Sequence, residues 1–300
     1  MDVITHKFKK FSKIVKNICA EAQIPLYNSR FSNKIFSNVQ HLFLYVAKEN
    51  CNFTYRRFSE LLYDSKLPQY IGLRRIPHFT TLQKFVSRIK SKVFDRIIFE
   101  TRSLFRQIGT IWGVDSTGFE LDQASAHYCK RIDRQEPVKG FVNLNAISDL
   151  YNKIFVVVKL RKYRRHDCID LKCMYPKIKN EPFDYFVADK GYDAEYNHKL
   201  VFESGKHSLI SLKYMDLPSC RTRGQYRKKA KREFEDGIFG QRSLTESNFS
   251  ALKRRFGSKL KARTYQTQKI ELLAKIFNFN MERAIKTMIL MLRRMLWIST

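Results

Sequence analysis

Residues 109–119 read GTIWGVDSTGF, and this stretch decides the fold that we expect for the second half of the chain. Its isoleucine, tryptophan and valine favour a β-strand, and glycines bound the apolar run. Asp115 follows that run directly. A carboxylate at the end of a buried strand is costly unless something uses its charge. The stretch therefore predicts a strand over 109–114 that leads into a functional acid, with a turn or capping aspartate as the alternative.

Two later segments carry acids that match Asp115. Residues 184–188 form a second apolar run, and it leads directly into Asp189. Glu246 lies on a helical stretch, where helical spacing places Arg242 and Lys253 on the same face. A routine ion-pair face would have this pattern too, but further positive charge follows at Arg254 and Arg255.

Two strand-end aspartates and a helical glutamate on a basic chain indicate metal-dependent cleavage of nucleic acid. Two magnesium ions about 3.5–4 Å apart can activate the attacking oxygen and stabilise the leaving one. Magnesium prefers hard oxygen ligands and keeps some of its waters, so few carboxylates are needed. We therefore expect Asp115, Asp189 and Glu246 to be catalytic and to ligate two Mg²⁺ ions, for which Mn²⁺ could substitute.

The composition indicates a folded protein with a polyanionic partner. The 300 residues suffice for one large domain or two ordinary ones, and 44% are hydrophobic. The 57 basic residues outnumber the 28 acidic ones and give a net charge of +29. Because basic residues recur along the whole chain, nucleic acid is the expected partner. A ribosomal protein or a protein of anionic membranes is the alternative.

The cysteines and apolar segments suggest where the protein works. Its 6 cysteines form no CxxC pair, which favours free thiols in a reducing cytoplasm over a zinc ribbon. Lysines interrupt the start of the chain, so we expect no signal peptide. The most apolar stretch, 288–292, is far shorter than the roughly 20 residues of a membrane span. We expect a cytoplasmic, nucleoid-associated protein without a membrane partner.

Residues 1–104 are expected to be helical. Apolar residues recur at helical spacing in three segments, 8–18, 36–46 and 54–63. A further helix is expected over 80–89, where Thr80 would cap and Gln83 would reach back in a capping box. Short helices around a turn suggest a helix-turn-helix. A plain helical bundle is the alternative, because nothing local singles out a recognition helix.

Residues 105–300 begin with a mixed α/β pattern. Five strands are expected, over 109–114, 141–147, 153–160, 184–188 and 208–213, with helices over 170–178 and 194–204. The sequence at 149–152 is typical of a hairpin turn, so the second and third strands should be antiparallel neighbours. The expected fold class is α/β: a mixed five-stranded sheet with flanking helices, preceded by a helical region.

A basic segment interrupts this pattern at 214–236. Its proline and glycine predict an exposed loop, and we expect its cluster of like charges to contact DNA phosphates. A solvated charged surface is the alternative. The cluster consists of Arg227, Lys228, Lys229, Lys231 and Arg232. Helices are expected beyond it, one ending at Gly257 and a last one over 267–296.

His166, Asp167 and Asp193 are weaker candidates. His166 could act as a general base, but a loop turn with Asp167 as a capping residue is the better interpretation. Asp193 precedes Ala194 and is interpreted as the N-cap of the next helix, which leaves Asp189 as the strand-end acid.

Together these segments resemble the DDE transposases of bacterial and archaeal insertion sequences. The resemblance is to the group with a Tyr-x2-Arg-x3-Glu-x6-Lys signature around the third acid. The spacing matches at all four positions and the identity at three of them, which here are Phe239, Arg242, Glu246 and Lys253. The likeness spans residues 34–285 and includes the segments 114–116, 166–167, 188–193 and 255–257.

This resemblance implies a ribonuclease H-like catalytic domain that holds Asp115, Asp189 and Glu246 around two magnesium ions. It implies that residues 1–104 bind the terminal inverted repeats of double-stranded DNA, and that the enzyme is a homodimer in its DNA complex. Water would first nick the transposon end, and the freed 3′-hydroxyl would then attack the opposite strand or target DNA. Further DNA contacts are expected from Lys190, Tyr192, Arg242, Lys253, Arg254 and Arg255.

Phe239 departs from the signature. The tyrosine of the family is expected to touch a DNA phosphate through its hydroxyl, which phenylalanine lacks. The departure puts one DNA contact in doubt but no metal ligand. Two other functions remain open: a structure-specific nuclease of the same fold, such as a junction resolvase, and a non-catalytic DNA-binding protein derived from a transposase.

Overall fold

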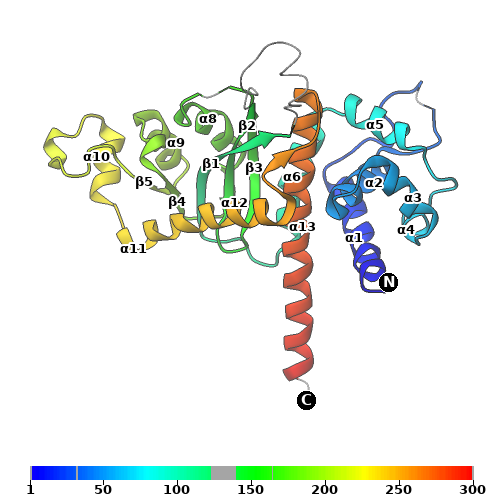
Figure 1. Ribbon diagram of the computed structural model, residues 1–300. Coiled ribbons are helices and arrows are strands. Elements are labelled where there is room, and N and C mark those ends of the chain that lie inside the picture. Colours follow the sequence, from blue (N-terminus) through cyan, green and yellow to red (C-terminus); the bar gives the residue numbers. More distant parts are fainter. Residues whose placement is uncertain (1, 32, 123–139, 164, 299–300) are drawn as a thin grey trace, which may run out of the picture. The chain divides into compact units, whose positions relative to one another are not determined.

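The computed structural model describes residues 2–31, 33–122, 140–163 and 165–298 (Figure 1). The chain divides into two compact units, and each is described by itself. The first consists of Met1–Thr101 and Ala262–Ile285, and the second of Arg102–Lys261 and Lys286–Thr300. The expected boundary near residue 104 lies close to this division, whereas residues 262–285 were expected in the second domain.

Helices form the N-terminal part of the first unit. They are α1 (Asp2–Glu21), α2 (Asn38–Cys51), α3 (Tyr55–Tyr63), α4 (Leu67–Tyr70), α5 (Phe79–Arg88) and α6 (Ser91–Glu100), and the 3₁₀ helix η1 (Thr101–Leu104) follows. The apolar faces expected from the periodicity are buried, as Phe11, Phe43 and Phe58 illustrate. Helices α4 and α6 were not expected as separate elements.

The start of α5 corrects one expectation. The helix begins at Phe79 with His78 as its N-cap, and His78 Nδ1 accepts from the N–H of Thr80. Thr80 and Gln83 therefore form no capping box. Helix α5 packs against α2 and α3, but the segment between α3 and α5 contains α4 and is longer than a helix-turn-helix turn.

Helix α13 (Tyr265–Ile298) explains why residues 262–285 belong to the first unit. Three of its amide side chains donate to partners on other elements of that unit. Gln266 Nε2 donates to Ile89 O at 2.8 Å, and Asn280 Nδ2 donates to Thr101 Oγ1 at 2.8 Å. Asn278 Nδ2 donates to Val46 O at 2.9 Å. Hydrophobic periodicity predicts the helix, but not these long-range bonds.

The second unit is built on a mixed six-stranded sheet of order β3-β2-β1-β4-β5, with β6 paired to β1. Its strands are β1 (Ile111–Leu121), β2 (Phe141–Asp149), β3 (Ile154–Arg161), β4 (Tyr185–Ala188), β5 (His207–Ile210) and β6 (Lys259–Leu260). Strands β2 and β3 are antiparallel neighbours, as expected from the hairpin turn. Strand β1 is antiparallel to β2, and β4 and β5 run parallel to β1. The sixth strand was not expected, because two residues carry no pattern.

Strand β1 is longer than expected. Its parallel pairing with β4 ends at Val114, but its antiparallel pairing with β2 continues as far as Glu120. The predicted end at residue 114 was wrong because β2 supplies ladder partners to the Ser-Thr-Gly sequence. Asp115 therefore lies inside β1, at the point where β1 continues beyond the end of β4.

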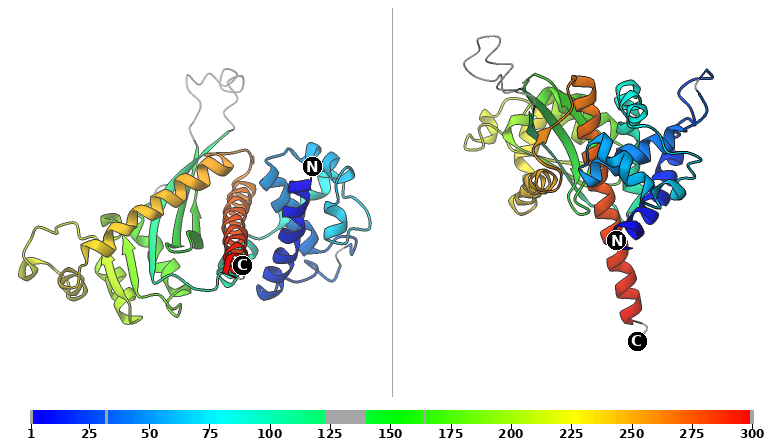
Figure 2. Two further views of the ribbon diagram at one scale, coloured as in Figure 1. Left: turned by 90° about the horizontal axis from the view of Figure 1, so that it is seen from below. Right: turned by 45° about the vertical axis from the view of Figure 1, so that its right-hand side comes forward.

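The helical elements of the second unit lie between its strands and after them along the chain. They are α8 (Cys168–Met174), η2 (Tyr175–Lys177), η3 (Lys190–Tyr192), α9 (Glu195–Glu203), η4 (Ser219–Arg221), α10 (Gln225–Arg232), α11 (Asp236–Phe239), η5 (Gly240–Arg242) and α12 (Ser243–Phe256). Figures 1 and 2 show α12 running across the strands, in agreement with its contacts to β1. It ends at Gly257, as expected, where φ is +80°. The expected loop over 214–236 was wrong in part, since it contains α10.

In the described part of the chain, no helix has both the length and the apolar character needed to cross a membrane.

Candidate active site

Asp115 of β1 lies just beyond the last register pair that β1 forms with β4, and Asp189 directly follows β4. Val114 and Ala188 are register partners in the parallel pair β1–β4, and each is followed directly by one of the two aspartates. The residues that follow an in-register pair of adjacent parallel strands lie next to each other, here where β4 and its ladder with β1 end. The pairing of the two acids, which the sequence could only suggest, is thus fixed by the backbone.

Helix α12 approaches β1 closely where Gly113 has no side chain. A Cβ on Gly113 would lie 2.8 Å from Thr245 Cγ2 and 2.9 Å from Val187 Cγ2. Side chains alternate along a strand, so Asp115 and Thr117 face the same side as Gly113. Thr245 Oγ1 lies 3.5 Å from Asp115 Oδ2, which places the first turn of α12 at the acid.

Glu246 follows Thr245 on that turn. Its Oε1 lies 2.8 Å from Nη1 of Arg242, and its side chain is 57% exposed. Arg242 belongs to η5 and is the N-cap of α12, so the expected ion pair forms across the start of the helix. Among the described residues, Arg242 is the partner of this exposed carboxylate, through Oε1.

The pKa of the Asp115 carboxyl is raised, and the causes connect the three acids. Burial is the largest cause, and the negative charges of Glu246 and Asp189 raise the pKa further. The N–H of Ser116 and the charge of Arg242 act in the opposite direction. Asp189 and Glu246 are therefore each close enough to Asp115 to raise the pKa of its carboxyl.

The donor set suits magnesium. Ser116 N–H donates to Asp115 Oδ1 and Lys190 N–H donates to Asp189 Oδ1, each at 2.8 Å, so both carboxylates have a fixed orientation. All the candidate ligand atoms are carboxylate oxygens, which Mg²⁺ prefers. Within the residues that the structure describes, no group of three His, Cys, Asp or Glu side chains is assembled closely enough for one ion. A bound cation would offset the burial of charge at Asp115.

Lys253 turns toward the sheet. Its Nζ donates to Thr117 Oγ1 at 2.7 Å and lies 5.3 Å from the centre of the Phe119 ring. Burial lowers the pKa of its ammonium, while the charge of Glu120 opposes the change. The other two cations of this helix are exposed: Arg254 donates to Ser250 Oγ, and Arg255 lies over the Phe256 ring.

The opposite face of β1 meets the start of α8. Ser116 Oγ donates to Asp167 Oδ2 at 2.8 Å. Asp167 occupies the N-cap position of α8, as expected, but its side chain makes no capping bond and is used for Ser116 instead. His166 is exposed and precedes it. The bond spans 51 residues of sequence, and no local pattern indicates it.

Tyr192 lies in the interior beneath this face. Its side chain is 2% exposed, and its hydroxyl donates to Asn145 Oδ1 at 2.9 Å. Burial raises the pKa of Tyr192 well above its usual value, and Asp167 and Asp115 add to the increase. The phenol expected to contact DNA instead supports the sheet. Lys190, two residues earlier, is exposed.

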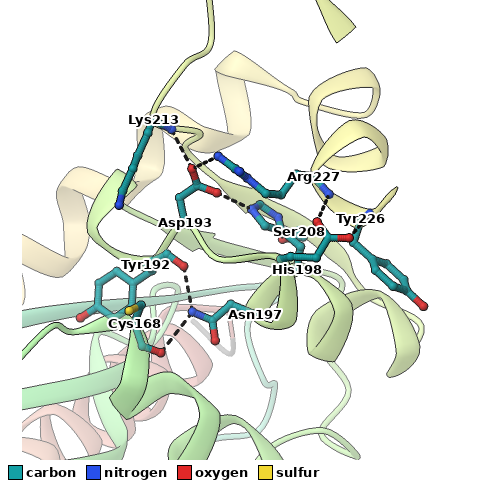
Figure 3. Close-up of polar contacts among 10 residues, drawn as sticks. Cys168, Tyr192, Asp193, Asn197, His198, Ser208, Lys213, Tyr226 and Arg227 are labelled. Atoms are coloured by element: carbon teal, nitrogen blue, oxygen red, sulfur yellow. Dashed lines mark hydrogen bonds and ion pairs between the residues drawn. The ribbon is translucent and has the colours of Figure 1, made fainter. Parts of the chain in front are cut away.

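Asp193 is a buried hub, as Figure 3 shows. Its Oδ2 accepts from Arg227 Nη2 at 2.6 Å and from Lys213 N–H at 2.9 Å, and its Oδ1 lies 3.4 Å from His198 Nε2. Burial raises the pKa of Asp193, but these hydrogen bonds together outweigh it and the pKa is lowered. The N-cap of α9 is Ala194, so the capping role expected for Asp193 was wrong.

Glu195 fixes the beginning of α10. Its carboxylate accepts from the N–H groups of Tyr226 at 2.8 Å and Arg227 at 3.1 Å. These are N–H groups that the first turn of a helix leaves unpaired, so a distant residue caps α10. Gly224 precedes the helix with φ +94°, and a Cβ there would lie 2.0 Å from Glu195 Oε2.

This docking divides the basic cluster of α10. Arg227 pairs with Asp193, Lys231 donates to the carbonyls of Met215 and Leu217, and Lys229 lies 3.9 Å from Glu233 and over the Phe202 ring. Among the described residues, Lys228 and Arg232 have no side-chain hydrogen bond or ion pair. The five cations expected to act alike therefore differ in role.

Phe239 packs as an apolar residue. Its ring centre lies 5.0 Å from that of Phe234, and it packs against the buried cluster of Leu150, Val187 and Leu209. The ring thus has a structural role that needs no hydroxyl.

These features define a mixed α/β protein with an acidic site where β4 ends beside β1. Residues 109–281, more than half of the chain, match the transposase DDE domain family. The chain therefore belongs to that family, which confirms the resemblance to insertion-sequence DDE transposases. A cryo-EM structure of a piggyBac transposase synaptic complex with hairpin DNA is similar at 10% identity and a TM-score of 0.47, over 96% of this chain and 73% of that one. No curated protein matches the chain.

Proposed function

We propose that this transposase binds terminal inverted repeats of a mobile element, nicks the DNA and joins the freed 3′-hydroxyl ends to target DNA. One observation carries the proposal. Val114 and Ala188 are register partners, so Asp115 and Asp189 lie next to each other where β4 ends. The charge of Glu246 also raises the pKa of Asp115. Strand order β3-β2-β1-β4-β5, antiparallel then parallel, supports a ribonuclease H-like domain.

Asp115, Asp189 and Glu246 would hold two Mg²⁺ ions, or Mn²⁺ in their place. When bound, such ions activate the attacking oxygen and stabilise the leaving one. The chain's own contribution is orientation. The N–H groups of Ser116 and Lys190 fix the two aspartates, and Arg242 restrains Glu246.

The DNA would be held by cations around this edge. Lys190, Arg254 and Arg255 are exposed, as is Arg232 on α10. Such contacts attract any sequence and weaken with salt. A homodimer would hold two DNA ends at once, and the cytoplasm, with its nucleoid, would be the place of action.

The decisive experiment is magnesium-dependent nicking of a supercoiled plasmid that carries the DNA flanking the gene. Asp115→Asn, Asp189→Asn and Glu246→Gln keep the side-chain shapes but remove the anions. We expect each to slow nicking on the order of 10²–10³-fold, the size of effect expected when one transition-state stabiliser is lost. DNA binding, measured in parallel by gel shift, should persist or tighten because a negative charge has been removed.

Two matched controls separate catalysis from folding. Asp184→Asn changes an exposed aspartate at the other end of β4. Glu203→Gln disrupts an i,i+4 ion pair, with Lys199 on α9, like that of Glu246. Both should nick normally. A Glu246→Gln enzyme that nicks at the wild-type rate would overturn the assignment, and nicking without joining would favour a nuclease.

A further inference from the structure

Helix α5 presents an exposed polar face. Leu82, Phe85 and Val86 are buried, and the Phe85 ring stacks on His41 of α2 with ring centres 4.6 Å apart. On the other side, polar residues recur at i, i+3, i+4, i+7 and i+8, which is one face of a helix. They are Thr80, Gln83, Lys84, Ser87 and Arg88, and all but the half-buried Thr80 are exposed.

The chemistry of this face fits the edges of DNA bases. It offers an amide, two hydroxyls and two cations, and Phe79–Arg88 contains no acidic residue. In the major groove, a glutamine can bond adenine in two places and an arginine can do the same with guanine. A face made of lysines alone would bind only DNA phosphates, whereas this mixture of side chains can also discriminate between bases.

The start of α5 leaves Gln83 available. A capping box would have engaged its amide with the backbone, but His78 caps the helix instead. Thr80 Oγ1 lies 2.8 Å from His78 Nδ1, and Ser87 Oγ donates to Lys84 O. In the described part of the chain, the side chain of Gln83 makes no hydrogen bond. Its two donors and its acceptor can therefore serve a ligand.

Cations lie beside this face. Arg56 of α3 lies over the ring of Phe79, 5.2 Å from its centre, which places it at the start of α5. Arg56, Arg57 and Arg74 are exposed. The one acid of α3, Glu60, is also exposed, so the arginines outnumber it on this side of the unit. Figure 1 shows α5 beside α3, with which it also packs. This arrangement provides phosphate contacts on the flank of a base-reading helix.

We propose that α5 enters the major groove of double-stranded DNA and reads the sequence of the element's ends, with Gln83 on an adenine and Arg88 on a guanine. Arg56 and Arg57 hold the adjacent backbone. This inference rests on the proposed function, because it names the surface by which the transposase recognises its DNA.

The test is selection of duplexes from a randomised DNA pool by the full-length protein, followed by sequencing of the bound fraction. The wild type should enrich one motif. Gln83→Ala should lose discrimination at one adenine position by about 5-fold to 150-fold, the range for a bidentate contact. Gln83→Glu should change the preference there to cytosine, whose amino group the carboxylate accepts. A misfolded variant cannot produce a new preference.

Matched controls lie on α1 of the same unit, where Asn17 and Lys13 are also exposed helical residues. Asn17→Ala and Lys13→Ala should retain the wild-type motif. The inference fails if the wild-type motif is also retained by Gln83→Ala, Gln83→Glu and Arg88→Ala, because α5 then does not read bases. The proposed function would still stand in that case, provided that the wild-type protein nicks the plasmid. If the wild type enriches no motif, the inference fails as well. A wild-type protein that does not nick the plasmid would instead overturn the proposed function.

Discussion

Ser116 and Asp167 are joined by a 2.8 Å hydrogen bond from the serine hydroxyl to Oδ2 of the aspartate. The same serine donates its backbone N–H to Asp115 Oδ1. One residue therefore connects a candidate metal ligand on one face of β1 with an acid on the other. This makes Asp167 a positioning residue, which acts on Asp115 through Ser116.

Asp167→Ala should slow magnesium-dependent nicking by about 10–100-fold and raise the magnesium concentration needed, as expected for loss of an outer partner of a metal ligand. Asp167→Asn retains an acceptor oxygen for Ser116 and should recover most of the activity. A magnesium titration of both variants distinguishes this role from a structural one. Equal losses in the two variants would contradict the positioning role and indicate that the charge itself is needed.

Gly113→Ala should destabilise the second unit by about 1–3 kcal/mol, because the added methyl group would overlap Thr245 and Val187 and push α12 from β1. Gly118→Ala on the same strand is the control, since a Cβ there meets nothing within 4 Å. Thermal unfolding of the two variants gives the comparison. Nicking should fall more in Gly113→Ala, and equal melting temperatures would show that α12 does not need the close approach.

Asp193→Asn should cost about 1.5–3 kcal/mol of stability at neutral pH, the range for hydrogen bonds to a charged group. The folded-state pKa of Asp193 is lowered from 3.8, so its carboxylate contributes stability in full above 3.8 and loses it as the pH falls through the lower folded value. The difference between wild type and variant should therefore shrink in acid. Thermal melts from neutral pH to below 3.8 measure it, and a difference that grew on acidification would contradict the sign.

Lys228→Ala with Arg232→Ala should weaken binding to all DNA sequences alike and flatten the salt dependence by about 0.9 log units of slope for each phosphate that is no longer neutralised. Stability should be unchanged, because these two side chains have no ion pair among the described residues. Arg227→Ala should destabilise α10 instead, since it leaves Asp193 without its 2.6 Å partner. Binding titrations at several salt concentrations, with melts of each variant, separate the two classes. An unchanged slope would make Lys228 and Arg232 part of a solvated surface.

Much of the sheet could be predicted because its signals are local. The hairpin near 149–152 and the strand that leads into Asp189 are properties of short segments, and both are found as the sequence predicts. The extension of β1 beyond Asp115 could not be predicted, since Gly118 is unfavourable in a strand and the segment is held in the sheet by its pairing with β2.

The other omissions arise from contacts between distant residues. Helix α10 consists largely of good helix formers, but its like charges repel one another at helical spacing, and its start is capped by Glu195, 31 residues before Tyr226. Asp193 looks like a helix cap in sequence because Ala194 follows it, yet its partners include Arg227, 34 residues later. Patterns of neighbouring residues contain no information on such pairs.

The alternation of β1 has a consequence for how this protein can evolve. Asp115 faces α12 and Ser116 faces α8, although the two are adjacent in sequence. One residue inserted between Ile111 and Asp115 would exchange these faces and turn the acid away from Glu246, whatever residue was inserted. A substitution in this stretch keeps the remaining side chains on their faces of the sheet, whereas a one-residue change in its length does not. In a library of single-residue insertions, we therefore expect no active clone to have its insertion between Ile111 and Asp115.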